Sequence, residues 1–360
     1  MRLLQLALIL LVLLVSTPAL TQTAEPSPVA EGEWQVTDLR GYDIDGVPIA
    51  LSPDGRWIAG AGPDAKGVCV WAVEVMTSTC AGEEIVPYPF SIVWAPDSSA
   101  IAFVDGEPSR PEPNTLWLFT ASSGALTVLD RAGVIHQAPA WTLDSTTVLY
   151  LAEGIDGKGS AIHRVSRAGG ESHQVTGADL DVQEPLVATA DGRVVFATGE
   201  EPALRLWIVE LDGSDLERFA ADIHTGTSVP TRLGGWGPGD AYLTMVDTHT
   251  TDAGRVTMRW YTLDRASGLL VPLDLPDVSS ATTGPGWWSH APEMLALGSD
   301  DGQAPLQLYT VDPHTGAARP LSGGTFDGDV TYWTLSFGAD GQAMVATVGT
   351  VWLMTLEYRS

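Results

Sequence analysis

The chain lacks the short motifs that mark many hydrolases and nucleotide-binding enzymes. It contains no Gly-x-Ser-x-Gly elbow, no His-Glu-x-x-His pair, and no Walker or Rossmann glycine signature. Without the elbow there is no serine-peptidase nucleophile, and without the histidine pair no zinc site is encoded locally. Asparagine occurs once, as Asn114, so a calcium site would need carboxylates and backbone carbonyls instead. We therefore expect no cofactor. Calcium stays open as an alternative, although no clear motif encodes a site for it.

Basic residues are also scarce. The 360 residues include 18 Lys and Arg against 45 Asp and Glu, which gives a formal net charge of −27. Such a surface repels phosphate backbones and anionic membranes. We exclude nucleic acid as a partner and attribute most of the acidity to solubility outside the cell.

Only two cysteines are present, Cys69 and Cys80. In an exported chain an even pair suggests a disulfide, and both residues fall in one expected hairpin. The register of that hairpin decides whether their Cβ atoms can meet. The sequence alone leaves this disulfide open.

The one long apolar run stands at the N-terminus, from Leu3 to Val15, directly after the basic Arg2. Small residues follow it, as in a secretory signal peptide, and it is shorter than the ~20 residues of a spanning helix. We assign residues 1–24 to a signal peptide and 25–32 to a linker, with cleavage after residue 19 as the other choice. The chain is then secreted, periplasmic or held in the cell envelope. An uncleaved leader that anchors it in a membrane is the alternative.

One pattern repeats along the rest of the chain: an apolar strand, a turn that contains Asp, and a second apolar strand. The clearest copies are residues 49–59 (IALSPDGRWIA) and 92–103 (IVWAPDSSAIAF). Later copies are more worn, but their anchor positions stay about 47 to 52 residues apart. These anchors are Trp94, Trp141, Ala188, Trp236, Trp288 and Phe337. A period of this length is typical of a propeller blade.

Each copy continues with a third strand that carries a large aromatic residue, a Gly-containing turn and a more polar fourth strand. Such a sheet has two apolar faces, so the copies must pack face to face around an axis. Six copies are complete, and a seventh lacks its outer strand, which residues 34–39 can supply. We predict an all-β fold: one seven-bladed β-propeller domain over residues 33–358, closed by the N-terminal strand in the last blade. Six blades is the alternative count.

The Pro-Asp frames at 51–59 and 94–103 resemble the PD40 repeats of the TolB-like, WD40-like β-propeller family. The resemblance covers nearly the whole mature chain, and it implies the fold more strongly than any activity. The family includes periplasmic protein-interaction scaffolds and propeller domains fused to hydrolases. This sequence shows neither the α/β domain of TolB nor a hydrolase domain, so the resemblance implies a binding propeller that stands alone.

The strand order places two kinds of connection at opposite ends of each blade. The first-to-second and third-to-fourth turns are short, and we call their side the short-turn face. The other connections are long and varied, and they form the long-loop face, where function is expected. Residues that precede the inner strands would surround the channel mouth on this face. The candidate ligand-binding residues are Tyr88, Phe90, His136, Glu184, His224, Trp287, Asp327 and Tyr332.

Two functions remain open. The first is a non-enzymatic module that binds a protein, a peptide or a small ligand in the cell envelope, most simply as a monomer. The second is a hydrolase or lyase whose dispersed carboxylates and histidines meet at the channel mouth. In an enzyme, two or more of His136, Glu184, His224 and Asp327 should converge with perturbed pKa values. We assign no catalytic residue and no metal ligand.

Overall fold

The computed structural model describes most of the chain after residue 32. The described residues are 33–88, 91–106, 114–131, 138–153, 159–180, 182–198, 205–219, 230–237, 240–250, 256–275, 286–287, 293–298, 305–326 and 333–359. The predicted signal peptide and linker lie outside this part. Within it, no helix has the length and apolar character needed to cross a membrane, and the helical elements are two 3-10 turns, Pro63–Ala65 and Ala178–Leu180.

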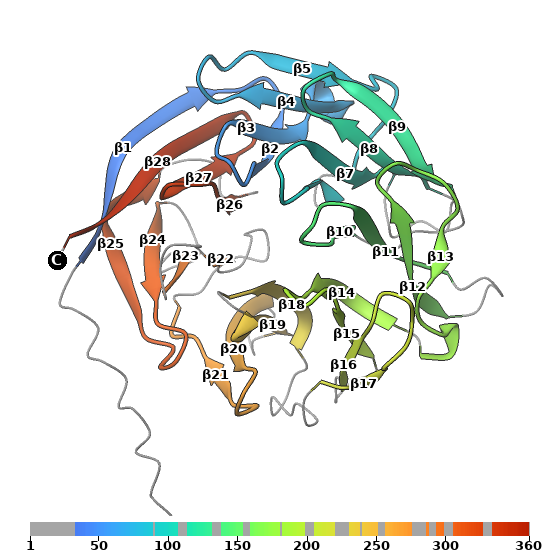
Figure 1. Cartoon of the computed structure of the whole chain (residues 1–360). Helices are drawn as coiled ribbons and strands as arrows, with labels where there is room; N and C mark the ends of the chain where they lie inside the picture. The colour runs from blue at the N-terminus through green and yellow to red at the C-terminus, as the bar shows by residue number, and fades with distance from the viewer. Residues whose placement is uncertain are drawn as a thin grey trace, which may run out of the picture.

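Small antiparallel sheets stand around a central axis, as Figure 1 shows. Five of them have four strands each, in sequence order from the inner to the outer edge. The first contains β2 (Val47–Leu51), β3 (Trp57–Ala61), β4 (Val68–Ala72) and β5 (Ser78–Ala81). The second contains β6 (Val93–Trp94), β7 (Ala100–Val104), β8 (Leu116–Thr120) and β9 (Ala125–Asp130). The third contains β10 (Ala140–Trp141), β11 (Thr147–Glu153), β12 (Ser160–Ser166) and β13 (His173–Gln174).

The fourth and fifth sheets repeat this order. The fourth contains β14 (Val182–Ala188), β15 (Val194–Thr198), β16 (Arg205–Val209) and β17 (Glu217–Arg218). The fifth contains β18 (Pro230–Trp236), β19 (Tyr242–Thr250), β20 (Val256–Asp264) and β21 (Leu270–Pro272). The predicted all-β, propeller-like fold is confirmed.

The rest of the ring is one sheet of eight strands. Half of it is β22 (Gly286–Trp287), β23 (Met294–Gly298), β24 (Leu306–Val311) and β25 (Ala318–Phe326). The other half is β1 (Glu33–Asp43), β28 (Thr350–Arg359), β27 (Gln342–Thr347) and β26 (Thr334–Phe337). The sequence predicted seven blades, whereas the described residues form five four-stranded sheets and this eight-stranded one. The two halves share hydrogen bonds because β1 and β25 pair in parallel, with Gln35 opposite Ser322.

The first and last strands of the domain lie side by side. β1 pairs antiparallel with β28 from Glu33 opposite Arg359 to Asp43 opposite Thr350. The predicted pairing of residues 34–39 with the C-terminal strand is therefore confirmed. One irregularity interrupts the pairing, a register shift between Thr37 and Arg40.

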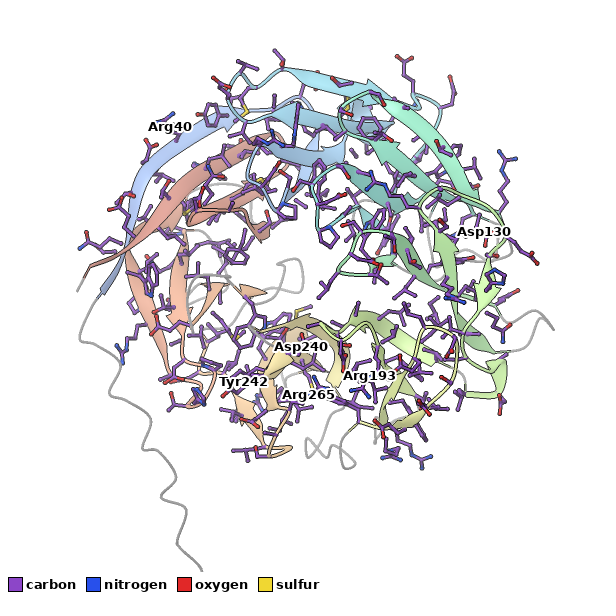
Figure 2. All side chains as sticks on the ribbon, in the orientation of Figure 1. Arg40, Asp130, Arg193, Asp240, Tyr242 and Arg265 are labelled. Carbon is purple, nitrogen blue, oxygen red and sulfur yellow. A yellow bond between two sulfur atoms is a disulfide. The ribbon has the colours of Figure 1, made fainter. Side chains whose placement is uncertain are left out.

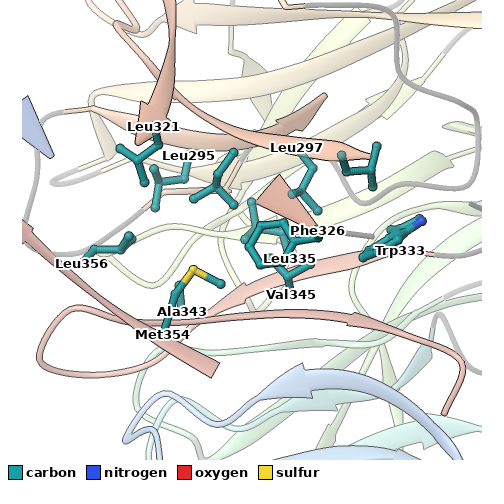
Figure 3. Close-up of a cluster of buried hydrophobic side chains, with 12 residues drawn as sticks. Leu295, Leu297, Leu321, Phe326, Trp333, Leu335, Ala343, Val345, Met354 and Leu356 are labelled. Carbon is teal, nitrogen blue, oxygen red and sulfur yellow. The ribbon is translucent and has the colours of Figure 1, made fainter. Parts of the chain in front are cut away.

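The hydrophobic core lies between neighbouring sheets. The second strands are buried along their whole length, as in β3 after Trp57 and throughout β7 and β15, because both faces of each sheet are covered. Figure 3 shows the cluster that joins the halves of the eight-stranded sheet, with Leu295 and Leu297 against Val345 and Met354. Packing between the sheets, more than pairing within them, holds the ring together.

Candidate ligand-binding site

Five of the eight predicted channel-mouth residues lie outside the described residues. These are Phe90, His136, His224, Asp327 and Tyr332. Glu184 lies in β14, where its backbone but not its side chain is described. Tyr88 and Trp287 are therefore the only two whose side chains can be placed.

Tyr88 lies at the long-loop face, as expected. Its backbone N–H donates to the carbonyl of Val104 at the end of β7, at 2.9 Å. Its own carbonyl accepts from the hydroxyl of Ser91 at 2.7 Å, and the Tyr88 side chain is half-buried. The backbone that presents this ring is thus fixed by hydrogen bonds to the second sheet.

Trp287 lies at the opposite face from the one predicted. It is opposite Met294, the first residue of β23, so it belongs beside the short β22–β23 connection. Its ring stacks on Tyr242 at 5.7 Å between centroids. The Tyr242 hydroxyl in turn hydrogen-bonds with Nδ1 of His314 at 2.8 Å. The sequence predicted Trp287 ahead of the inner strand, at the channel mouth. The structure has it as the last residue of that strand, at its short-turn end.

The environment of Tyr242 is acidic. Burial raises the pKa of its hydroxyl, and the carboxylates of Asp264 and Asp312 add to the shift. Tyr242, Trp287 and His314 come from β19, β22 and the β24–β25 turn, so they join two neighbouring sheets. The rings pack on one another and against Gly237, which makes them a packed corner between sheets.

The Asp residues of the repeats cap their own turns. In four copies the carboxylate accepts a hydrogen bond from the residue two places later. The pairs are Asp54–Arg56, Asp97–Ser99, Asp144–Thr146 and Asp191–Arg193. Hydrogen bonds from Arg193 and then Thr189 lower the pKa of Asp191 to about 2. These carboxylates stay ionised and act as turn caps.

In two copies the residue after the repeat Asp takes a second structural role. Ser98 and Ser145 have φ values of 61° and 60°, and their hydroxyls accept from the backbone N–H of Asp54 and Asp97 in the preceding copies. Asp240, labelled in Figure 2, has a φ of 55°, and its carboxylate accepts likewise from the N–H of Ala190. Its displaced position in the repeat is thereby explained. These residues of the repeat therefore connect neighbouring sheets.

A buried polar group lies between the second and third sheets. The Tyr150 hydroxyl donates to Asp130 at the end of β9, and burial together with this bond raises the pKa of Tyr150. His163 lies opposite Tyr150, with ring centroids 5.5 Å apart. Burial lowers the pKa of His163, and its Nε2 is buried without a hydrogen-bond partner. The imidazole is therefore held neutral in the interior.

An open pocket among the described residues lies where the ring closes. It has a volume of about 190 Å³ and is bounded by β1, the β4–β5 turn, β27 and β28. We call it the seam pocket. Its lining residues are Asp38, Arg40, Tyr42, Val73, Glu74, Gln342, Leu353, Met354 and Thr355. Glu74 lies in the short β4–β5 turn, and Gln342 is the first residue of β27, directly after the short β26–β27 turn. The pocket therefore opens beside the short-turn face.

Arg40 is the cation of the seam pocket. Its Nε and Nη2 donate to the two carboxylate oxygens of Asp38 at 2.9 and 2.7 Å. Hydrogen bonds with Asp38 and Tyr42 raise the pKa of Arg40. Both members of the ion pair are more than half exposed, at 62% and 57%. The pair therefore fixes the direction of the guanidinium without removing it from solvent.

Sequence reasoning missed this pocket because its walls are far apart in the chain. Arg40, Glu74 and Gln342 belong to no motif, and they meet only when β1 pairs with β28. The signal that could have found them is the predicted ring closure itself. It implies that residues after the first strand lie beside the first blade.

Cys69 and Cys80 face each other on β4 and β5 and form a disulfide. Cys69 is fully buried and Cys80 is exposed. No three His, Cys, Asp or Glu side chains gather as metal ligands within the described part of the chain. The expected absence of a cofactor remains a prediction.

No protein-family model and no curated protein matches this chain. Among solved structures, an oligogalacturonate lyase in complex with manganese has a TM-score of 0.60 at 17% identity, over 91% of this chain and 99% of that chain. The oligogalacturonate lyase of Vibrio parahaemolyticus has the same score at 13% identity, over 91% and 98%. A prolyl endopeptidase scores 0.53 at 14% identity, over 85% of this chain and 46% of that chain. At such identities the likeness shows the β-propeller fold alone.

Proposed function

We propose that this chain is a TolB-like binding propeller, exported by residues 1–24, that holds a protein partner of the cell envelope and performs no catalysis. The observation that supports this most directly is the seam pocket. It is open, it carries the fixed guanidinium of Arg40, and exposed apolar side chains stand at its edge. In this proposal the protein is a monomer, and its rigid ring of sheets holds the partner.

Two exposed apolar residues are sequence neighbours of residues that line the seam pocket. Leu39 follows Asp38 and is 42% exposed, and Val75 follows Glu74 and is 62% exposed. Exposed apolar residues beside a pocket and rimmed by charge are typical of interaction surfaces. The described Asp and Ser residues of the repeat turns, in contrast, make hydrogen bonds within their turns or to the neighbouring sheet.

We count the eight-stranded sheet as two blades, which makes seven. Each half has the strand order of the separate sheets, and the register between β25 and β1 joins them at Gln35 and Ser322 alone. In this count β1 is the outer strand of the last blade. The seam pocket is then a gap between the last and first blades, widened where the two chain ends meet.

The long-loop face is a second proposed surface on the same ring. There we place Tyr88 with Phe90, His136, Glu184, His224, Asp327 and Tyr332 around the channel mouth. The hydrolase or lyase reading would rest on likeness of fold alone, which does not carry an activity. We therefore propose binding for both faces.

Photo-crosslinking in the native envelope tests this function. A photoreactive amino acid replaces Val75 at the seam or, as a matched control, Leu269, which is 60% exposed and lies in the corresponding β20–β21 turn of the fifth sheet. A discrete protein adduct from position 75 and none from position 269 is the expected result. The same adducts from both positions, or no adduct from position 75, would overturn the function proposed for the seam pocket.

A further inference from the structure

We infer that the seam pocket takes an apolar side chain followed by a basic residue, in an extended segment of the partner protein. This inference rests on the proposed function and adds the chemistry of the bound segment. The argument uses the shape of β1, the polarity of the walls, the pocket volume and the charge of the chain.

A β-bulge in β1 shapes the pocket. Two residues, Asp38 and Leu39, stand between Thr37 and Arg40, while β28 has only Met354 between their partners. Asp38 has φ of 50°, and among the nine described non-glycine residues with positive φ it alone lies within a strand. Bulges re-aim side chains, and a left-handed non-glycine residue stores backbone strain, and both features are found at functional positions.

The bulge sets the directions of the side chains around the pocket opening. The carboxylate of Asp38 turns back to hold Arg40, and Leu39 is exposed to solvent. A guanidinium has five N–H donors in a fixed fork. Asp38 occupies two of those of Arg40, and Tyr42 also hydrogen-bonds with this group. The donors that neither residue engages suit the carbonyl oxygens of an extended peptide backbone, which would lie along the rim.

The floor of the pocket is apolar. Val73 and Leu353 are partly buried members of one core cluster. Met354 is the next residue of β28, and its side chain is buried in the cluster on the other face of the sheet. The volume of about 190 Å³ is below the ~300–1,000 Å³ of pockets that enclose a drug-sized ligand. It therefore suits one aliphatic side chain, with the rest of the segment outside.

Charge selects the residue beside that side chain. Glu74 is exposed on the wall opposite β1, and the whole chain carries a formal charge of −27. Arg40 is already neutralised by Asp38, so the rim as a whole is negative. A lysine or arginine next to the inserted side chain would pair with Glu74, and the field of the protein would draw such a segment in.

Methyl NMR of the full mature chain tests this inference with three capped tetrapeptides. The probes are acetyl-Gly-Leu-Lys-Gly-amide, its Leu-Glu counterpart and its Ser-Lys counterpart. The reporters are the methyl signals of Val73 and Leu353, each assigned by a single conservative substitution. We expect the Leu-Lys peptide to shift these signals in a saturable way, the Leu-Glu peptide to bind more weakly, and the Ser-Lys peptide to leave them unchanged.

Glu74→Gln should weaken binding of the Leu-Lys peptide about two- to fivefold, the range of an exposed ion pair, and added salt should reduce the difference. The matched control Glu84→Gln changes an exposed carboxylate of the connection after β5 and should leave the affinity unchanged. If the Leu-Lys and Leu-Glu peptides bind equally and Glu74→Gln has no effect, the charge preference is wrong while the site stands. If neither leucine peptide shifts the reporters, the seam pocket is not the binding site, and the proposed function loses its main support.

Discussion

The hydroxyl of Ser145 accepts a hydrogen bond of 3.0 Å from the backbone N–H of Asp97, 48 residues earlier in the chain. Ser98 accepts in the same way from the N–H of Asp54, at 2.9 Å. Each bond joins the Asp turn of one sheet to the Asp turn of the next. The short-turn face is thus tied together by the same residues that make the repeat visible in the sequence.

Removal of one such tie should lower stability without changing the fold. We expect Ser145→Ala to reduce the free energy of unfolding by about 1 kcal/mol, the net value of a typical hydrogen bond. Ser145→Gly also loses the hydroxyl, but it should cost less because glycine adopts the φ of 60° freely. Denaturant unfolding measures both, with the exposed Ser122→Ala as control. A loss in Ser122→Ala equal to that in Ser145→Ala would contradict the assignment.

The disulfide should stabilise the first sheet. Cys69 and Cys80 are 11 residues apart, and closing a loop of this size in the unfolded chain is worth about 3 kcal/mol in the chain-entropy model. Addition of a reductant should therefore lower the denaturant midpoint. The double variant Cys69→Ala, Cys80→Ala should be insensitive to the reductant. An unchanged midpoint for the reduced natural sequence would refute this contribution.

His163 should make stability depend on pH. Burial lowers its pKa in the folded protein, so the unfolded chain takes up a proton first as the pH falls. The contribution is fully present above the ordinary histidine pKa of about 6.5, and it is lost as the pH falls from there toward the folded pKa. We expect His163→Gln to flatten the fall in unfolding free energy between about pH 7 and pH 5.

The control for this titration is His173, which is exposed at the end of the same sheet. The pH slope of His163→Gln is compared with the slopes of His173→Gln and of the natural sequence. The comparison uses slopes, since either substitution could change stability at every pH. Equal slopes for His163→Gln and the natural sequence would show that His163 does not titrate differently in the folded protein.

Asp191 should act in the opposite part of the pH range. Its hydrogen bonds lower its pKa to about 2, so its contribution is present above the ordinary aspartate value and is lost as the pH falls toward 2. Asp191→Asn should reduce the acid dependence of unfolding in this window. The exposed side chain limits the size of the effect. Equal acid dependence in the variant would exclude Asp191 as a stabilising anion.

The repeat made the architecture predictable because its residues form the contacts between neighbouring sheets. Trp94 and Trp141 donate from Nε1 to the carbonyls of Ala50 and Val93 in the preceding sheets, and their spacing in the sequence follows the spacing of the sheets. The pairing of β1 with β28 was predictable from the missing outer strand of the last copy. The merging of two sheets was not, since it depends on how far β1 reaches toward Ser322.

The candidate site was far less predictable than the fold. Trp287 lies at the short-turn face because it is the last residue of β22 and pairs with the first residue of β23, and periodicity does not resolve such a boundary. The seam pocket combines β1, a turn of the first sheet and the last two strands. A pocket made of segments that meet only on ring closure leaves no local pattern in the sequence.

Hydrogen exchange measured by mass spectrometry on the full chain tests ring closure most directly, and the seam pocket depends on that closure. Peptides that contain Glu33–Asp43 and Thr350–Arg359 report on the two strands. The account predicts that both strands are protected, and that they lose protection together when denaturant is raised. Rapid exchange of Glu33–Asp43 while Thr350–Arg359 stays protected would show an open ring, and it would remove both the seam pocket and the function proposed for it.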